Sequence, residues 1–171
     1  MRIRLLVGGR LFVLAAGLLT ATGLIGHLIG LMMLTTTVGP TAYLLLAHPD
    51  TEAAQVRSAV LGHAAATAGG LACLAAFGLW RRPSIIERHI DTPAQIGAQA
   101  LGVGLTLLAL VVLDAHHPPA AATALMITSG IARPGLPLFG MLTGLAVVIT
   151  TAVALAKIPW LRVPTRRTFH D

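Results

Sequence analysis

The sequence predicts an all-α membrane protein with four transmembrane helices in two parallel repeats, each with a short broken or re-entrant helix. Of its 171 residues, 56% are hydrophobic and 11% are charged, whereas about a quarter of the residues in a soluble domain are charged. Four apolar stretches reach the roughly 20 residues that a membrane-spanning helix needs. They are Leu11–Leu34, Ala53–Leu79, Ala94–Leu113 and Leu136–Ile158. The length allows one small bundle, so we expect a single transmembrane domain over residues 1–171.

The first apolar stretch follows a segment with three arginines, an arrangement that signal peptides also show. Here the apolar run is longer than a signal peptide requires, and no clear small-residue cleavage site precedes polar sequence. We therefore expect this stretch to be retained as the first span.

The basic residues predict how the spans are oriented. Three groups lie before the first span, between the second and third, and after the fourth: Arg2, Arg4 and Arg10; Arg81, Arg82 and Arg88; Lys157, Arg162, Arg166 and Arg167. Ten of the twelve basic residues would then share one side, with only Arg57 and Arg133 opposite. Basic loops favour the cytoplasm, so both termini and the loop Arg81–Thr92 are expected on the cytoplasmic side of a bacterial inner membrane. Topology thus accounts for the net charge of +6 without nucleic-acid binding.

The two halves of the chain, about residues 5–80 and 88–160, share one order of features. Each has a span, a short segment with proline, and a second span. Pro40-Thr41-Ala42 and Pro119-Ala120-Ala121 each open a helix that is too short to cross a bilayer. With two spans in each half, the halves should point the same way, as in transporters with parallel repeats. Chance similarity between Ala-, Gly- and Leu-rich helices is the alternative.

The N-termini of the two short helices are candidate anion sites. The first N–H groups of a helix lack partners, and its dipole places partial positive charge there. If both short helices dip into the membrane, their N-termini could line one polar spot, formed by Gly39, Pro40 and Thr41 together with His117, Pro118, Pro119 and Ala120. The alternative is that both segments are surface loops where spans meet.

Ionisable side chains gather at the second break and inside the second span. Asp114, His116 and His117 precede Pro118-Pro119, and His63 lies about ten residues into the second span. Such groups are costly in a membrane and usually face the interior of the bundle, and histidine can carry a proton near neutral pH. Thr123 adds a hydroxyl. These residues could bind an anion or exchange a proton, or instead cap a helix and link helices.

Other chemistry receives little support from the sequence. There is no phosphate-binding loop with lysine and no nucleophile–base pair within the spans, so no enzyme and no cofactor are predicted. Asp114, His116 and His117 could bind a metal with His48 or His63, but their spacing is not a familiar ligand set. No metal site is therefore predicted.

Several motifs resemble, in order, those of the HPP family of small integral membrane proteins. His117-Pro118-Pro119, followed by Ala120 to Ala124, resembles the family's signature. The segment Gly39–Pro49 is similar to its first Gly-x-Ser/Thr-Ala segment. Gly62-His63 is similar to its Gly-Gly-His stretch, although Leu61 replaces the first glycine. The resemblance covers about residues 30–155, and His116 departs from it by adding a second histidine.

The resemblance implies a four-span membrane protein, and plant and cyanobacterial relatives are implicated in nitrite transport. We therefore expect a transporter or channel for a small inorganic anion such as nitrite, with His117 and His63 donating hydrogen bonds to it. Four spans are few for a pathway within one chain, so a homo-oligomer in the lipid bilayer is expected. Two alternatives stay open, a structural or regulatory membrane subunit and a divalent-metal transporter.

Overall fold

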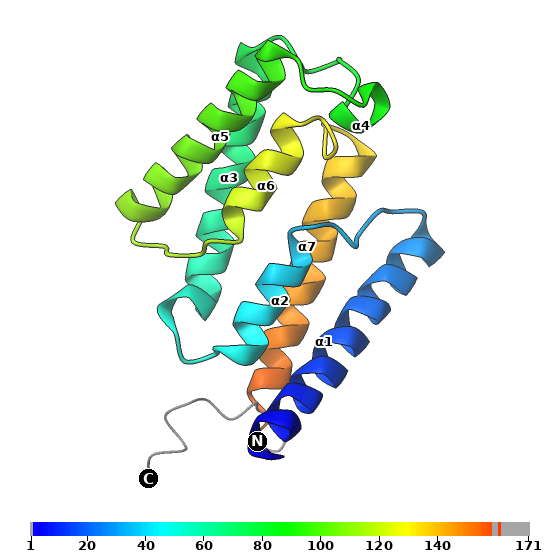
Figure 1. Ribbon diagram of the computed structural model, residues 1–171, viewed down its shortest axis with the longest axis vertical. Coiled ribbons are helices and arrows are strands. Elements are labelled where there is room, and N and C mark those ends of the chain that lie inside the picture. The colour runs from blue at the N-terminus through cyan, green and yellow to red at the C-terminus, as the bar shows by residue number, and fades with distance from the viewer. Residues whose placement is uncertain (1, 159–160, 162–171) are drawn as a thin grey trace.

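The computed structural model describes residues 2–158 and 161 and the side chains of residues 4–158 and 161. All regular elements in this part of the chain are helices (Figure 1). They are α1 (Arg2–Ile29), α2 (Val38–Ala47), the 3-10 helix η1 (Glu52–Ala54), α3 (Val56–Ala76), α4 (Ile85–Arg88), α5 (Pro93–Val112), α6 (Ala120–Thr128) and α7 (Leu136–Ala156). Trp160, Arg162, Arg166 and Arg167, on which the repeat and the orientation partly rested, lie outside the described residues.

The four spans expected from the sequence are confirmed. In the described residues, α1, α3, α5 and α7 are the helices long and apolar enough to cross a membrane. The first span ends at Ile29 and not at Leu34. Gly30 adopts φ +72°, and the N–H of Leu31 donates to the carbonyl oxygen of Gly26 at 2.8 Å. A left-handed glycine with such a bond is a common way to end a helix.

Two glycines of α7 contact an irregular segment of backbone that follows α1. A Cβ atom at Gly140 would lie 2.8 Å from the carbonyl oxygen of Met32, and one at Gly144 would clash with the carbonyl oxygen of Met33. The backbone of Met32 and Met33 can therefore lie against α7 only because these two positions lack side chains. The packing places part of the irregular segment that follows α1 directly on α7.

Each short helix crosses the bundle together with its irregular flanks. On one side, Met33 packs at Gly144, and farther along α2 Leu45 shares a pocket with Val153. The first break therefore runs along most of α7. On the other side, α6 follows α3, because Ala120 packs at Gly62 and Ile127 packs at Gly70. The chain does not return to the side from which it came, so the re-entrant interpretation is not confirmed, and both segments are broken crossings.

The two halves run in opposite directions, and the parallel orientation expected for them is not confirmed. Helices α1 and α3 point towards the top of Figure 1, whereas α5 and α7 point towards its bottom. The cause is the extra crossing that each short segment makes, which gives each half three crossings in place of two. An odd number of crossings inverts the next half, as in transporters with inverted repeats.

The loop between the halves therefore lies at the end of the bundle opposite the N-terminus (Figure 1). Within this loop, the N–H of Ile85 donates to the carbonyl oxygen of Ser129 at 3.1 Å, and Arg133 lies 3.5 Å from Glu87. The backbone N–H and hydroxyl of Ser84, with the charge of Arg133, hold the pKa of Glu87 below its usual value. These contacts place Arg133 on the same side as the loop.

The expected charge asymmetry is consequently not present in the described residues. Basic residues lie at both ends of the bundle, with Arg4, Arg10, Arg57 and Lys157 at one end and Arg81, Arg82, Arg88 and Arg133 at the other. The prediction of ten basic residues on one side is wrong because it counted four crossings. The cytoplasmic position of both termini stays a prediction.

Replacing Gly144 with alanine should destabilise the protein. The new methyl group would displace the backbone of Met33, and overpacking of this kind costs about 1–3 kcal/mol. We expect the melting temperature in detergent to fall by several degrees. In the control Gly104→Ala, nothing lies within 4 Å of the added Cβ atom, so the melting temperature should stay constant or rise slightly. Equal effects of both changes would contradict the packing of residues 30–37 on α7.

The opposite ends of the bundle can be told apart by cysteine labelling. Cys73 is the chain's one cysteine and is buried, so a Cys73→Ala background allows single cysteines at the exposed positions Lys157 and His89. A membrane-impermeant maleimide added to oriented vesicles should label one of these two sites and spare the other until the membrane is opened. Labelling of both sites from the same side would show that the four-crossing topology is right.

Candidate functional site

His63 lies at the centre of a buried polar cluster between the two breaks. Its Nε2 atom lies 3.2 Å from Oγ1 of Thr41 on α2, and its Nδ1 atom lies 2.8 Å from Oγ1 of Thr123 on α6. Both threonines are the fourth residue of their short helix and are fully buried, while His63 is 5% exposed. One ring on α3 thus links equivalent positions of the two broken crossings.

The hydrogen-bond directions fix the state of His63. The hydroxyl of Thr41 donates to the carbonyl oxygen of Thr37 at 2.8 Å, so towards the ring it can act as an acceptor. Nε2 of His63 therefore carries the proton and donates to Thr41, and Nδ1 accepts from the hydroxyl of Thr123. This assignment satisfies both ring nitrogens with a neutral imidazole.

His117 lies beside His63 but has one unsatisfied nitrogen. Its Nδ1 atom donates to the carbonyl oxygen of Ala53 at 2.7 Å, which leaves Nε2 as an acceptor. Nε2 has no hydrogen-bond partner among the described residues, although the side chain is fully buried. The two imidazole rings meet edge to face with centroids 4.9 Å apart. A buried acceptor without a hydrogen-bond partner lowers the free energy of unfolding by about 1–3 kcal/mol. Nε2 of His117 is therefore a candidate for binding a ligand.

Gly62 allows this arrangement. A Cβ atom at Gly62 would lie 3.2 Å from the Cβ atoms of both His117 and Ala120, which is tighter than ordinary van der Waals contact. The absence of a side chain lets the second break approach α3 closely enough for the rings to touch. Ser58 lies one helical turn earlier on the same face of α3, and its buried hydroxyl also lacks a partner among the described residues.

The N-terminus of α6 is less open to an anion than the sequence suggests. The N–H groups of the first three residues of α6 donate to the carbonyl oxygens of His117, Pro118 and Pro119 at 3.0–3.2 Å. These tight turns occupy the donors that an anion would use. Neither Thr37 nor Pro119 caps its helix with a side chain, so no side chain of these two residues occupies the N–H groups at the helix starts.

The sequence-predicted site residues separate into two groups. The structure brings together His63, His117, Thr41, Thr123 and Ala120 within the bundle. The others lie towards its outside or its ends: Gly39 and Pro40 are half-buried and exposed, Pro118 is exposed, and Asp114 and His116 are exposed. Pro119 is buried at the start of α6. Sequence reasoning missed Ser58, because a single serine in an apolar helix carries no signal of its own.

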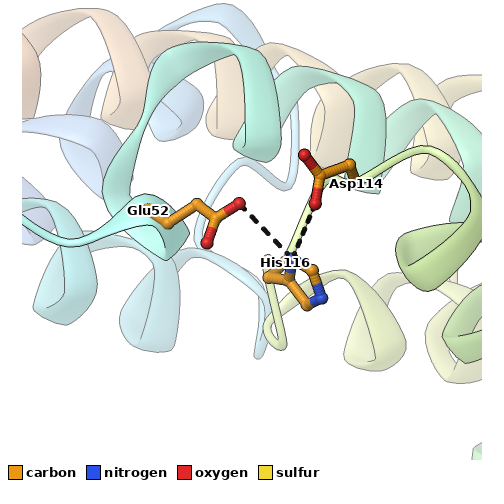
Figure 2. A group of neighbouring side chains, drawn as sticks. All are labelled: Glu52, Asp114 and His116. Carbon is orange, nitrogen blue, oxygen red and sulfur yellow. Dashed lines mark ion pairs between the residues drawn. The ribbon is translucent and has the colours of Figure 1, made fainter.

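The metal set considered from the sequence does not form. His117 points inward, and Nε2 of His48 lies 3.1 Å from the hydroxyl of Tyr43. Asp114 and His116 point outward and approach Glu52 on η1 instead (Figure 2). No sequence pattern indicated Glu52, which lies more than 60 residues from its two neighbours.

Comparison with known proteins yields one match. A family model described as "HPP, transmembrane region" matches residues 2–164. No curated protein and no solved structure matches the chain.

The unpartnered hydroxyl of Ser58 and the hydrogen-bonded hydroxyl of Thr123 predict different responses to mutation. Ser58→Ala removes a buried hydroxyl that has no partner and should leave the melting temperature of the ligand-free protein unchanged or raised. Thr123→Val deprives Nδ1 of His63 of its donor and should lower the free energy of unfolding by about 1–3 kcal/mol. Thermal unfolding in detergent measures both variants against the intact protein. Equal destabilisation by the two variants would mean that the Ser58 hydroxyl has a partner after all.

Proposed function

Since the chain belongs to the HPP family of integral membrane proteins, we propose that it is a transporter or channel for a small inorganic anion, with nitrite the substrate that the family resemblance suggests. The observation that carries the proposal is the buried cluster of His63, His117, Thr41 and Thr123 between two broken crossings. Polar groups inside a membrane bundle are costly and mark substrate or proton pathways. Substrate sites at broken helices are typical of transporters with repeats.

The cluster supports joint passage of an anion and a proton. Neutral His117 offers a lone pair at Nε2, so it can take a proton and then donate that proton's hydrogen bond to an anion. The unpartnered hydroxyl of Ser58 supplies a second donor on the same face. A proton and a monovalent anion together carry no net charge, which reduces the cost of crossing the apolar interior.

His63 has a different role in this mechanism. Both of its ring nitrogens already have threonine partners, one from each half of the molecule. It therefore holds the two breaks together and gives His117 a polar neighbour. Because the cluster is buried, passage requires the inverted halves to move relative to each other, as in alternating access.

The remaining expectations belong to this proposal. We place the protein in a bacterial inner membrane with both termini cytoplasmic and as a homo-oligomer, and we include no chemical conversion of the anion. The alternative of a structural subunit would use the same hydrogen bonds for assembly alone. The two alternatives differ in whether the purified chain moves an anion by itself.

Uptake of nitrite into proteoliposomes at alkaline pH tests the proposal directly. The intact protein should take up nitrite faster than empty liposomes, which control for nitrous acid that crosses lipid unaided, and an internal pH dye should report acidification. Removing the proton-accepting nitrogen in His117→Gln should reduce the protein-dependent rate by about tenfold or more, as for a lost hydrogen bond to a charged group.

His27→Gln is the matched control, because His27 is exposed on α1 and has no contact with the cluster. Its uptake rate should equal that of the intact protein. A rate in the intact protein no higher than in empty liposomes, for nitrite, nitrate and formate alike, would overturn the transport proposal. Normal uptake by His117→Gln would exclude His117 from the pathway.

A further inference from the structure

Three metal-binding side chains meet at the end of the bundle that carries the N-terminus. Glu52 on η1 belongs to the first half of the chain, and Asp114 and His116 belong to the second break (Figure 2). Oε1 of Glu52 and Oδ1 of Asp114 lie 3.6 and 3.7 Å from the same atom, Nδ1 of His116. Each side chain is more than half exposed, so dissolved ions reach all three.

Hydrogen bonding by His116 does not explain why both carboxylates lie close to its Nδ1 atom. Nδ1 of His116 can carry one proton, so it can donate to one carboxylate and not to two. Both distances also exceed the roughly 2.7–3.2 Å of an N–H···O hydrogen bond. Two negatively charged groups thus face one ring nitrogen without a hydrogen bond to it. A cation between the three atoms would satisfy them together.

The distances fit a small tetrahedral ion. Zn²⁺ binds imidazole nitrogen at about 2.0–2.1 Å and carboxylate oxygen at about 2.0–2.2 Å. Two ligand atoms on one tetrahedral zinc ion are then about 3.4 Å apart, close to the 3.6 and 3.7 Å between His116 and its two carboxylates. All three ligand atoms lie within 4.8 Å of one another, so small side-chain rotations complete the site.

Neighbouring hydrogen bonds hold the ligands in place. Arg57 at the start of α3 donates to the carbonyl oxygens of Leu113 and Asp114 at 3.1 and 2.9 Å. On the inner side, His117 donates to Ala53 next to Glu52. These bonds already join η1 and the start of α3 to the second break. An ion would therefore bind to side chains whose backbone is already ordered.

We propose that Glu52, Asp114 and His116 bind one divalent cation of the zinc class, with water in the fourth position, and that this ion joins the two halves of the bundle. Two carboxylates and one imidazole suit zinc better than Ca²⁺, which takes about six to eight oxygen ligands. Because His117 follows His116 directly, the ion would also restrain the break that carries the buried ring. Slower anion uptake with zinc bound is a consequence that rests on the proposed transport function.

Zinc binding to purified protein tests the site without any transport measurement. The full chain, without a polyhistidine tag and stripped with a chelator, is titrated with Zn²⁺ by calorimetry. One zinc ion per chain should bind in the tightest class and raise the melting temperature. In His116→Gln and Glu52→Gln, the affinity should fall by at least about tenfold, and the melting temperature should no longer respond to zinc. His48→Gln, an exposed histidine at the same end, should bind zinc as the intact chain does.

The outcomes separate this proposal from the transport proposal. Unchanged zinc affinity in His116→Gln would overturn the site. Displacement of zinc by an equal concentration of Ca²⁺ would also overturn it, because that result is typical of an acidic surface and not of a zinc site. If zinc binds as expected but the protein moves no anion, the site stands and the transport proposal fails.

Discussion

The whole structure depends on how interrupted backbone is satisfied inside a lipid bilayer, where no water replaces a missing hydrogen bond. The chain meets this constraint partly by packing one side of each break against a long helix. Met32 and Met33 of the first break lie against Gly140 and Gly144 of α7, and His117 of the second break lies against Gly62 of α3. At these glycines a side chain would occupy the space of the break itself. The glycines therefore determine where the polar backbone, and with it the polar side chains, can enter the bundle.

The same constraint determines the directions in which the two halves of the chain run. A short helix with irregular flanks crosses the bundle as completely as a long helix does, so each half has three crossings and the halves are inverted (Figure 1). Inversion brings the starts of α2 and α6 to the same region, and His63 meets the fourth residue of each. A parallel arrangement would have no reason to place these two positions on one imidazole ring. The central histidine and the inverted topology are thus one feature of the structure.

Sequence reasoning reached the family, the four long helices and the residues His63 and His117 because each has a local signal: a motif, hydropathy over about 20 residues, or a charge in an apolar run. It failed where the signal depends on packing. Hydropathy does not detect a crossing made of a ten-residue helix and irregular backbone, so the prediction that Arg81–Thr92 lies on the same side as the N-terminus was wrong. The sequence contains no signal for Ser58 and Glu52, because they become candidate site residues only through the neighbours that the fold brings to them.

In the proposed transport function, the two buried histidines have different roles. A site must bind its substrate strongly enough to admit it and weakly enough to release it. Because both of its ring nitrogens are bonded to threonines, His63 holds the two breaks together and would add little affinity for an anion. His117 retains one free acceptor that protonation would convert to a donor, so in the proposed mechanism His117 attracts an anion only while it holds the proton. Release of the proton ends the attraction, and this coupling would let a site buried in protein bind an anion and then let it go.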